Sequence, residues 1–322
     1  MYIYDVPTIV ETINSEGVSI VIPCYNSEQT LGELLRDIKS EFKEKSLINY
    51  EIILVVDGPK DRTLEVAIDQ QRMNKKITVL ELNRNFGQHA AIFAGLEESR
   101  LNFIVTMDDD GQHPVKSIYD LVTPLCGDID VVYGVSTEEE HNLFRNFFSK
   151  TAKYITYKLL NIPNAKNLSA FRGFKRIAMK GVDFKGLTSA VVDVVLHWNT
   201  NKFQTIQVNM SKRTKGKSNY NFYSLAKFAI QMITGYSVRP LRIATIAGLL
   251  TFFASFILLF SIAVQAINGD IIVVGYASLS LFVLFLGSIQ LLTLGLIGEY
   301  LGKVHEHSMG KPHYLIKRVI KS

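Results

Sequence analysis

Cysteine and tryptophan are almost absent from this sequence. Its 322 residues include two cysteines, Cys24 and Cys126, and a single tryptophan. Two cysteines cannot build a disulfide framework, and their spacing matches no metal-ligand motif, so we expect reduced thiols in a cytoplasmic domain. Because 48% of the residues are hydrophobic and 20% are charged, the composition also excludes a disordered chain and a coiled coil.

Acidic residues are missing from a long stretch in the second half. None occurs between Asp193 and Asp270, an interval that holds eight basic residues. Residues 1–193 carry 22 basic and 27 acidic side chains, whereas residues 194–322 carry 13 basic and 3 acidic ones. An acidic half with the composition of a soluble domain is therefore joined to a basic half that also contains the long apolar runs.

Charge of either sign is missing from 243–269 and from 271–298, which only Asp270 separates. At about 1.5 Å per residue, a helix over either run is long enough to cross a hydrocarbon core of roughly 30 Å. A pair of buried core helices is the alternative, but core helices are usually shorter and amphipathic. The sequence predicts a transmembrane hairpin within residues 239–300, with spans at about 243–267 and 271–298.

The basic residues around this hairpin predict its orientation. Arg239 and Arg242 precede it, five lysine and arginine residues follow it, and the connector 268–270 has no positive charge. The positive-inside rule then places residues 1–238 and the tail 301–322 in the cytoplasm, which makes this a multi-pass protein of the inner membrane. The N-terminus has no basic region followed by an apolar one, so we expect no signal peptide.

Short β-rich runs alternate with helical stretches over the first 135 residues. Strands are predicted at 18–23, 51–56, 78–82, 103–107 and 130–134, and helices at 28–42, 62–73, 88–99 and 114–125. The run 30–33 fits a capping box for the first of these helices, and an earlier start at Ser27 is the alternative. Such alternation is typical of an α/β domain with a doubly wound, mostly parallel sheet, which we assign to residues 1–220.

Two common nucleotide motifs are missing: there is neither GxGxxG nor a Walker A sequence, so a dinucleotide fold and a P-loop are not supported. Polar clusters instead follow four predicted strands, at 24–26, 57–58, 83–88 and 108–112. Ligands of doubly wound sheets bind at the carboxyl ends of the strands. We therefore expect these clusters to form one binding rim.

The run Asp108-Asp109-Asp110 is the sharpest local feature. Three carboxylates in a row after a buried strand repel one another, and a divalent cation relieves that repulsion. Alternate residues of an extended chain point the same way, so Asp108 and Asp110 can share one ion while Asp109 faces away. Oxygen ligands suit Mg²⁺ or Mn²⁺, which would bridge a diphosphate. A solvated acidic turn is the alternative.

Four motifs follow one another along the first part of the chain: Val21–Asn26, Asp57-Gly58 with Asp61 and Thr63, Asn85–Gln88 leading to Ala94-Gly95-Leu96, and Asp108–Pro114. In this order they resemble the motifs of inverting family-2 glycosyltransferases of GT-A fold. Later in the chain come Arg213, Gly216, Ser218 and Tyr220, then Pro240-Leu241-Arg242, the hairpin, and Gly298–Gly302. These later residues narrow the resemblance to the polyprenyl-phosphate glycosyltransferases, which include bactoprenol glucosyltransferases and dolichol-phosphate mannose synthases.

This resemblance implies roles for individual residues. The nucleotide would be bound by Pro23, Tyr25, Asn26, Asp57, Asn85, Gln88 and Asp108. Asp108 and Asp110 would hold the metal, and the catalytic group would comprise Asp110, Gln112 and His113, the last two beside the sugar. The sequence departs from the family at Val56 and Pro59, where Asp and Ser are common, and at His113, where many members have Asp.

Basic and aromatic residues interleave on the predicted acceptor side. Residues 142–160 read as an amphipathic helix, either packed on the core or lying at the membrane surface, and 221–238 as a second interfacial helix. The loop 212–218 has four cations in six residues; such loops are often solvated or bind nucleic acid, but this one precedes a membrane span. The acceptor phosphate would be bound by Arg145, Arg213, Lys215 and Ser218.

The sequence thus predicts a metal-dependent enzyme that moves one sugar from a nucleotide diphosphate sugar, with UDP favoured, to polyprenyl phosphate. We expect a lipid and a nucleotide sugar as partners, no nucleic acid, and lateral hairpin surface open to self-association. One rival is a processive polysaccharide synthase, but the QxxRW signature of that group is missing, since Trp198 lies in His197-Trp198-Asn199. The other rival is a non-catalytic membrane scaffold.

Overall fold

The computed structural model describes residues 8–136, 168–184 and 191–210, scattered positions from 241 to 268, and residues 275–310 and 312–321. These residues fall into two compact units. One unit contains the α/β domain together with the end of the chain from Gly310 onward. The other contains the described helical residues between 241 and 309.

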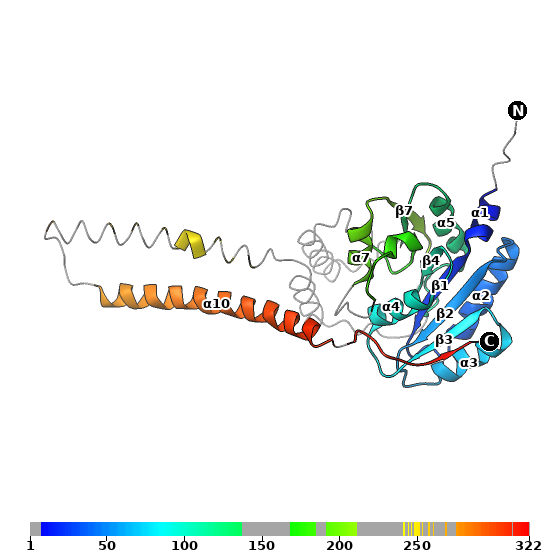
Figure 1. The fold of residues 1–322 in the computed structure, drawn as a ribbon, viewed down its shortest axis with the longest axis horizontal. Coiled ribbons are helices and arrows are strands. Elements are labelled where there is room, and N and C mark those ends of the chain that lie inside the picture. Colours follow the sequence, from blue (N-terminus) through cyan, green and yellow to red (C-terminus); the bar gives the residue numbers. More distant parts are fainter. Residues whose placement is uncertain are drawn as a thin grey trace, which may run out of the picture. The chain divides into compact units, whose positions relative to one another are not determined.

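An eight-stranded mixed sheet forms the centre of the α/β domain (Figure 1), in the order β7-β5-β6-β4-β1-β2-β3-β8. Strands β1 to β4 are parallel, with β1 between β4 and β2. Strands β6 and β8 run antiparallel to their neighbours, and β7 is parallel to β5. The strands are Val18–Cys24, Tyr50–Val56, Ile77–Leu82, Phe103–Thr106, Val131–Ser136, Arg172–Lys175, Phe203–Val208 and Ile316–Ile320 for β1 to β8.

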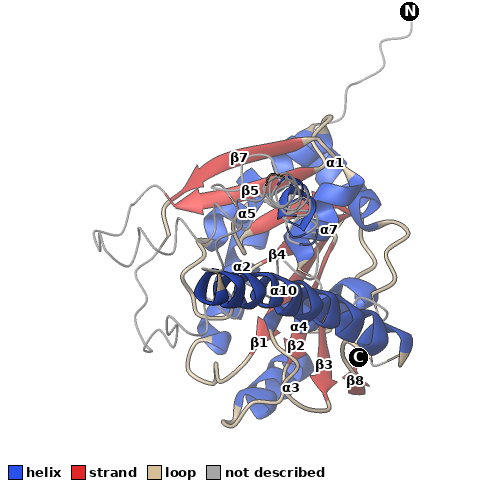
Figure 2. Ribbon diagram, turned by 90° about the vertical axis from the view of Figure 1, so that its left-hand side faces the viewer, coloured by secondary structure: helices blue, strands red, loops and turns tan. Residues whose placement is uncertain are grey.

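Helices cover both faces of this sheet (Figure 2). One face packs against α1 (Ile9–Glu16), α2 (Leu31–Glu44), α3 (Thr63–Met73) and α5 (Ile118–Val122), and the other against α4 (Gln88–Glu98) and α7 (Val192–Asn199). Side chains alternate along a strand, so Ile20 and Ile22 of β1 enter the first core and Val21 enters the second. This double burial explains why the central strands are apolar throughout.

A close approach between α4 and β1 depends on glycine. A Cβ atom at Gly95 would lie 2.4 Å from Cγ1 of Val21, well inside van der Waals contact. Any larger residue would therefore push the helix away from the strand. The spacing matters for the site because α4 begins at Gln88, on the loop that follows β3.

The five predicted strands are all present, within three residues of their predicted ends. Two helix predictions were wrong in detail. The helix expected over 114–125 is broken into the 3₁₀ turn η1 (Val115–Ser117), α5 and the 3₁₀ turn η2 (Thr123–Cys126), because Pro124 stands at the start of η2 and cannot continue the α5 hydrogen bonds. Thr30 precedes α2 but its hydroxyl makes no cap; it donates to the Asp109 carbonyl oxygen at 2.7 Å.

The tail predicted for 301–322 contains an element that the sequence analysis missed. Strand β8 pairs with β3, with Ile316 opposite Leu82 and Ile320 opposite Val79, and the Asn83 N–H donates to the Leu315 carbonyl at 2.9 Å. It is therefore the outer edge of the sheet, and because it is antiparallel it enters at the carboxyl end of β3. Two cations of β8, Lys317 and Arg318, both bind Glu81 of β3.

Helix α10 (Tyr276–Ser308) is 33 residues long and continues past the predicted end of the second span. Its segment Phe285–Gly302 has a mean hydropathy of 1.3, and none of that segment is buried. By length and composition alone it is the one helix among the described residues that qualifies as a candidate membrane span. Most of the first predicted span, 243–267, lies outside the described residues, so the two-helix hairpin stays a prediction.

Candidate active site

Four loops meet at the carboxyl ends of the parallel strands β1 to β4. They are residues 25–30 after β1, 57–62 after β2, 83–87 after β3 and 107–114 after β4. Because parallel strands end at the same edge of a sheet, these loops form one rim, as the sequence predicted. The predicted donor-site residues from Tyr25 onward all lie on this rim, whereas Pro23 is buried within β1.

The loop after β4 carries the three aspartates, and their side chains have different partners. Asp108 accepts a hydrogen bond from the Gln88 amide at 2.5 Å, and Asp110 accepts the Gln112 N–H at 3.1 Å. Asp109 turns toward the loop after β1, where its Oδ2 accepts the Tyr25 N–H at 2.9 Å. The chain can make this tight turn because Gly111 has a φ of 73°.

Burial gives Asp109 an unusual pKa. Burial is the largest effect and the charges of Asp108 and Asp110 act in the same direction, so the pKa rises to about 6. The Ser27 hydroxyl and the Tyr25 N–H oppose that rise without cancelling it. A cation beside this loop would stabilise all three carboxylates, because it would offset their mutual repulsion.

His113 is held from two sides beneath the acidic loop. Its side chain is 7% exposed, its ring stacks on Phe171 with centroids 5.0 Å apart, and its Nδ1 accepts the Asp108 N–H at 2.9 Å. Burial, with a smaller contribution from Arg172, lowers the pKa of His113 to about 4 against the effect of Asp110. The ring is therefore neutral at pH 7, and since Nδ1 is an acceptor the proton sits on Nε2.

Asp57 holds the loop after β3 in place. Its side chain is 3% exposed, and its two carboxylate oxygens accept the N–H groups of Phe86 at 2.7 Å and Gly87 at 2.8 Å. Burial raises the pKa of Asp57, while those two N–H groups and Arg84 act against the rise. Gly58 lies so close to this loop that a Cβ atom would sit 2.5 Å from the Asn85 nitrogen.

Further hydrogen bonds join the four loops into a closed circuit. Asn26 accepts the Lys60 N–H at 2.8 Å and the Ser27 N–H donates to Thr63 at 2.7 Å, which connects the first loop to the second. Asp57 connects the second loop to the third, Gln88 connects the third to the fourth, and Asp109 connects the fourth back to the first. These hydrogen bonds join all four loops of the rim to one another, which favours the precise positioning of a ligand.

Two carboxylates are available for a metal ion at this rim. Asp108 and Asp110 are partly exposed, and their oxygens are the donors that Mg²⁺ and Mn²⁺ prefer. Within the described part of the chain no group of three or more His, Cys, Asp or Glu residues is placed to hold a metal. The donor set therefore fits an ion that takes its remaining ligands from a diphosphate and water, rather than an ion enclosed by protein.

The cavity beside this loop has the wrong charge for a diphosphate. It has a volume of about 610 Å³ and lies between α2 and residues 110–116. Its acidic lining residues are Glu33, Asp37, Glu41, Glu44 and Asp110, against the single cation Lys116. Anionic phosphates would be repelled from it, so the nucleotide is better placed on the other side of Asp110, toward Tyr25 and Gln88.

Below the rim lies a buried ion pair that the sequence analysis missed. Arg172 of β6 is 1% exposed; it binds Asp193 of α7, and its Nε donates to the Thr106 hydroxyl at 3.0 Å. Tyr133 also donates to Asp193, at 3.1 Å. This pair joins β4, β5, β6 and α7 directly under the acidic loop, since Thr106 is the last residue of β4.

The predicted acceptor residues Arg145, Arg213, Lys215 and Ser218 lie outside the described residues, as do the predicted interfacial helices 142–160 and 221–238. Their roles therefore stay predictions.

A family model for glycosyl transferase family 2 matches residues 19–182, which contain every loop of this rim. The chain belongs to glycosyl transferase family 2. An uncharacterized glycosyltransferase from Synechocystis sp. is 32% identical over 93% of this chain and 94% of its own length. An undecaprenyl-phosphate 4-deoxy-4-formamido-L-arabinose transferase from Pseudomonas aeruginosa is 30% identical (95% and 91%), and a prophage bactoprenol glucosyl transferase homolog from Escherichia coli is also 30% identical (94% and 99%).

Solved structures agree on the fold. Glucosyl-3-phosphoglycerate synthase from Mycobacterium tuberculosis, crystallised with Mn²⁺, UDP and phosphoglyceric acid, superposes with a TM-score of 0.52 at 17% identity, covering 72% of this chain and 83% of its own. At that identity the likeness shows the fold alone. The family-2 enzyme is therefore built on a GT-A-like α/β domain with a mixed sheet, which confirms the resemblance recognised in the sequence. The sheet is mostly parallel, as expected, while β6 and β8 run antiparallel to their neighbours.

Proposed function

We propose that this enzyme transfers one sugar from a nucleotide diphosphate sugar to a polyprenyl phosphate, with inversion at the anomeric carbon, at the cytoplasmic face of the membrane. The observation that carries the proposal is the pair Asp108 and Asp110 at the end of β4, on a rim whose loops are mutually hydrogen-bonded. The acceptor class is supported by two relatives of nearly full length, whose names specify undecaprenyl phosphate and bactoprenol.

The rim residues divide the work of binding the donor. Tyr25, which is 43% exposed, would stack on the base, and the exposed residues Asn85 and Asn26 would contact the ribose. Asp108 and Asp110 would hold Mg²⁺ or Mn²⁺, which would supply positive charge to the diphosphate as it leaves. UDP is favoured as the nucleotide because glucosyl-3-phosphoglycerate synthase, which shares the fold, has been crystallised with UDP and Mn²⁺ and with UDP and Mg²⁺.

The transfer needs no proton to be removed from the acceptor. An oxygen of the lipid phosphate attacks the anomeric carbon from the face opposite the diphosphate; the new carbon–oxygen bond forms as the old one breaks, and the nucleoside diphosphate leaves with the electron pair. A phosphate monoester has its second pKa near 6, so most of the acceptor is already a dianion at pH 7. The residues must position this nucleophile and offset its charge, which is the role we assign to Gln112 and to the Nε2–H of His113.

Cations would bind the lipid phosphate. Arg145, Arg213 and Lys215, with the hydroxyl of Ser218, are the residues that we expect to contact it, since charge-assisted bonds to a phosphate are the strong ones. Replacing Arg145 or Arg213 with Ala should raise the KM for lipid phosphate, or lower turnover, by roughly 10–100-fold, because each such contact contributes about 1.5–3 kcal/mol. Nucleotide affinity measured on the same variants should change little, and an Ala variant with unchanged lipid kinetics would remove that residue from the acceptor site.

A membrane location follows from the acceptor and is supported by the apolar surface of α10. Leu291 and Leu292 are 72% and 67% exposed in the chain by itself, and no residue of the window Phe285–Gly302 is buried. A water-soluble protein rarely exposes an apolar surface of this length. We infer that α10 is the second helix of the predicted hairpin and that both ends of the hairpin face the cytoplasm.

The deciding experiment incubates the purified full-length protein with undecaprenyl phosphate, Mn²⁺ and a panel of UDP- and GDP-sugars. We expect a single lipid-linked sugar from one donor, and no product from Asp110→Asn. A growing polysaccharide would identify a processive synthase instead. Failure to bind either nucleotide in the presence of metal would identify a non-catalytic scaffold.

A further inference from the structure

Asp109 stands between the two predicted metal ligands, yet its contacts lead elsewhere. Its carboxylate accepts the Tyr25 N–H at 2.9 Å, and its carbonyl oxygen accepts the Thr30 hydroxyl at 2.7 Å. Tyr25 is the first residue after β1, and Thr30 is the last before α2. Asp109 is therefore hydrogen-bonded to both ends of the loop that contains Tyr25.

The middle of that same loop is held by a different part of the rim. Asn26 accepts the Lys60 N–H at 2.8 Å, and the Glu28 N–H donates to Asp61 at 3.2 Å. These two hydrogen bonds connect the Tyr25 loop to the loop after β2, but they do not connect it to the acidic loop. Asp109 does relate the two loops, because the Ser27 hydroxyl also interacts with its carboxylate, in addition to the contacts with Tyr25 and Thr30. Together these contacts set the register between the Tyr25 main chain and Asp108 and Asp110.

We propose that Asp109 is a positioning residue that couples the nucleoside half of the donor site to the metal half. Metal bound by Asp108 and Asp110 orders the acidic loop, Asp109 transmits that order to the Tyr25 main chain, and the Tyr25 ring is thereby placed for the base. By linkage the coupling is reciprocal, so a bound nucleoside tightens metal binding by the same factor. The identity of the ligand rests on the proposed function, whereas the coupling itself rests on the contacts of Asp109.

Two variants separate this role from that of a third metal ligand. Asp109→Asn keeps an oxygen that can accept the Tyr25 N–H, and Asp109→Ala removes it. If Asp109 positions Tyr25, Asn should bind nucleotide within about 3-fold of wild type, while Ala should weaken binding by about 10-fold or more, since a hydrogen bond to a charged group contributes that much. A metal ligand would behave differently, because an amide replaces a carboxylate poorly on Mg²⁺ and Asn would lose as much as Ala.

Affinity is measured by calorimetry on the full-length protein with Mn²⁺ and whichever of UDP and GDP the wild type binds more tightly. For Asp109→Ala we also expect KM for the donor to rise while kcat stays within about 3-fold, because the reacting groups are untouched. Equal losses in Asn and Ala, or wild-type affinity in Ala, would overturn the proposal.

A nucleoside without phosphates isolates the coupling from direct contact with the metal. Uridine or guanosine cannot bridge the ion, so any effect of Mg²⁺ on its binding must pass through the protein. Saturation-transfer NMR should show Mg²⁺ tightening nucleoside binding about 3- to 10-fold in wild type and having no effect in Asp109→Ala. The same Mg²⁺ effect in both proteins would refute the coupling.

Thr30→Val is the second variant, for use if Asp109→Ala does not fold. Valine keeps the volume of threonine and removes only the hydroxyl that binds the Asp109 carbonyl, so we expect a loss of nucleotide affinity of about 3-fold, with uridine or guanosine again losing its response to Mg²⁺. An unchanged response would count against the proposal. A wild-type protein that binds metal and nucleotide but forms no lipid-linked sugar would reject the proposed function and still leave the coupling measurable.

Discussion

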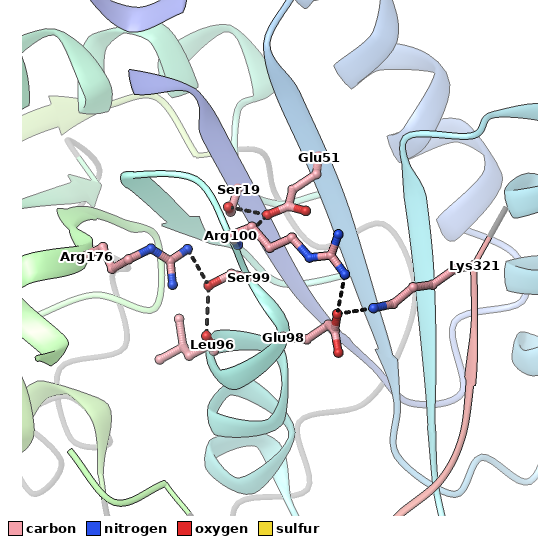
Figure 3. A network of polar contacts seen from close by, with 8 residues as sticks. All are labelled: Ser19, Glu51, Leu96, Glu98, Ser99, Arg100, Arg176 and Lys321. Carbon is pink, nitrogen blue, oxygen red and sulfur yellow. Dashed lines mark hydrogen bonds and ion pairs between the residues drawn. The ribbon is translucent and has the colours of Figure 1, made fainter. Parts of the chain in front are cut away.

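The two ends of the central sheet treat acidic side chains in opposite ways. At the amino ends of the strands, acids are matched by cations and hydroxyls of the same chain (Figure 3): Glu98 binds Arg100 and Lys321, and Glu51 accepts the Ser19 hydroxyl at 2.7 Å. Nearby, a hydrogen bond and the charge of Lys202 lower the pKa of Asp128. The chain thus supplies its own countercharge at this end.

At the carboxyl ends the partners described for the acids are mostly neutral N–H groups. Burial raises the pKa of Asp57 and of Asp109, and for Asp109 the neighbouring carboxylates add to the rise. Asp57 and Asp109 are therefore less stable as anions than the acids that are paired with cations at the amino ends. The difference teaches that the paired acids of the amino ends serve the fold, whereas at the rim Asp57 and Asp109 hold loops in place and Asp108 and Asp110 carry oxygens that suit an external cation.

Replacing one of the two predicted metal ligands should therefore cost activity without costing stability. Asp110→Asn retains the oxygen that accepts the Gln112 N–H but halves the charge offered to the metal. We expect turnover to fall by at least about a thousandfold and chelator to abolish the wild-type activity. The matched control is Asp128→Asn at the opposite end, which should keep full activity. Full wild-type activity in EDTA would break the comparison.

The buried pair beneath the rim should show the reverse pattern, a loss of stability. Removing one partner leaves the other as an uncompensated charge, so Arg172→Ala should lower the free energy of unfolding by about 3–5 kcal/mol, measured as a shift in thermal midpoint. The double variant Arg172→Met with Asp193→Leu should recover much of that loss. If the single variant is as stable as wild type, the pair does not support the rim.

His113 extends the comparison, because its ring is hydrogen-bonded to the acidic loop but carries no acidic group. His113→Ala should lower turnover by about 10–100-fold, less than Asp110→Asn, because it removes a positioning donor. Since burial holds its pKa near 4, His113 stays neutral above pH 5 in the folded enzyme, and the rate should rise to a plateau near pH 7 with acceptor ionisation.

His113→Asn is the control, because its side-chain oxygen can still accept the Asp108 N–H. Wild type, Ala and Asn should share the acidic limb of the pH–rate profile. An acidic limb that disappears in the Ala variant would identify His113 as the titrating base.

We expect the smallest effect from a change at Glu81, which lies where β3 pairs with β8. Burial raises its pKa, but hydrogen bonds from Lys317 and Arg318 outweigh burial and lower it. A lowered carboxyl pKa contributes stability that is complete above the unfolded value and is lost as pH falls through the folded value. Because both cations are more than half exposed, we expect Glu81→Gln to cost about 1 kcal/mol or less at pH 7.

The Glu81 cost should shrink as the pH falls below the ordinary glutamate pKa, and wild type and variant should melt together once the pH lies below the lowered pKa of the folded state. Glycosyl transfer by Glu81→Gln should be unchanged at pH 7. A loss of transfer with no loss of stability would place an acid of the fold in the active site.

The central strands and the rim could be predicted because each has a local signature. A strand buried on both faces is a short apolar run, and polar clusters mark the ends of β1 to β4. The alternation rule also placed Asp109 away from Asp108 and Asp110. Which group it would meet could not be predicted, because Tyr25 is 84 positions away in the sequence.

Other elements could not be predicted because their stabilising partners are distant in sequence. β6 has four residues, two of them charged, and is a strand because β4 and β5 provide its hydrogen bonds on both sides. From the sequence alone Arg172 would be assigned to the surface, because only the fold shows that Asp193 is its partner. The predicted capping box at Thr30 was wrong for the same reason: the Thr30 hydroxyl donates instead to the carbonyl of Asp109, which is 79 positions away in the sequence.

The edge strand β8 has a consequence for biosynthesis. It follows α10 in the sequence, so β3 remains an open edge while α10 is being synthesised. An unpaired edge is a template for association with other chains, and a nascent chain of this enzyme carries one for longer than a chain whose sheet closes early. The sheet is thereby completed only after the apolar helix has been synthesised, and a chain truncated before residue 316 would keep β3 as an open edge.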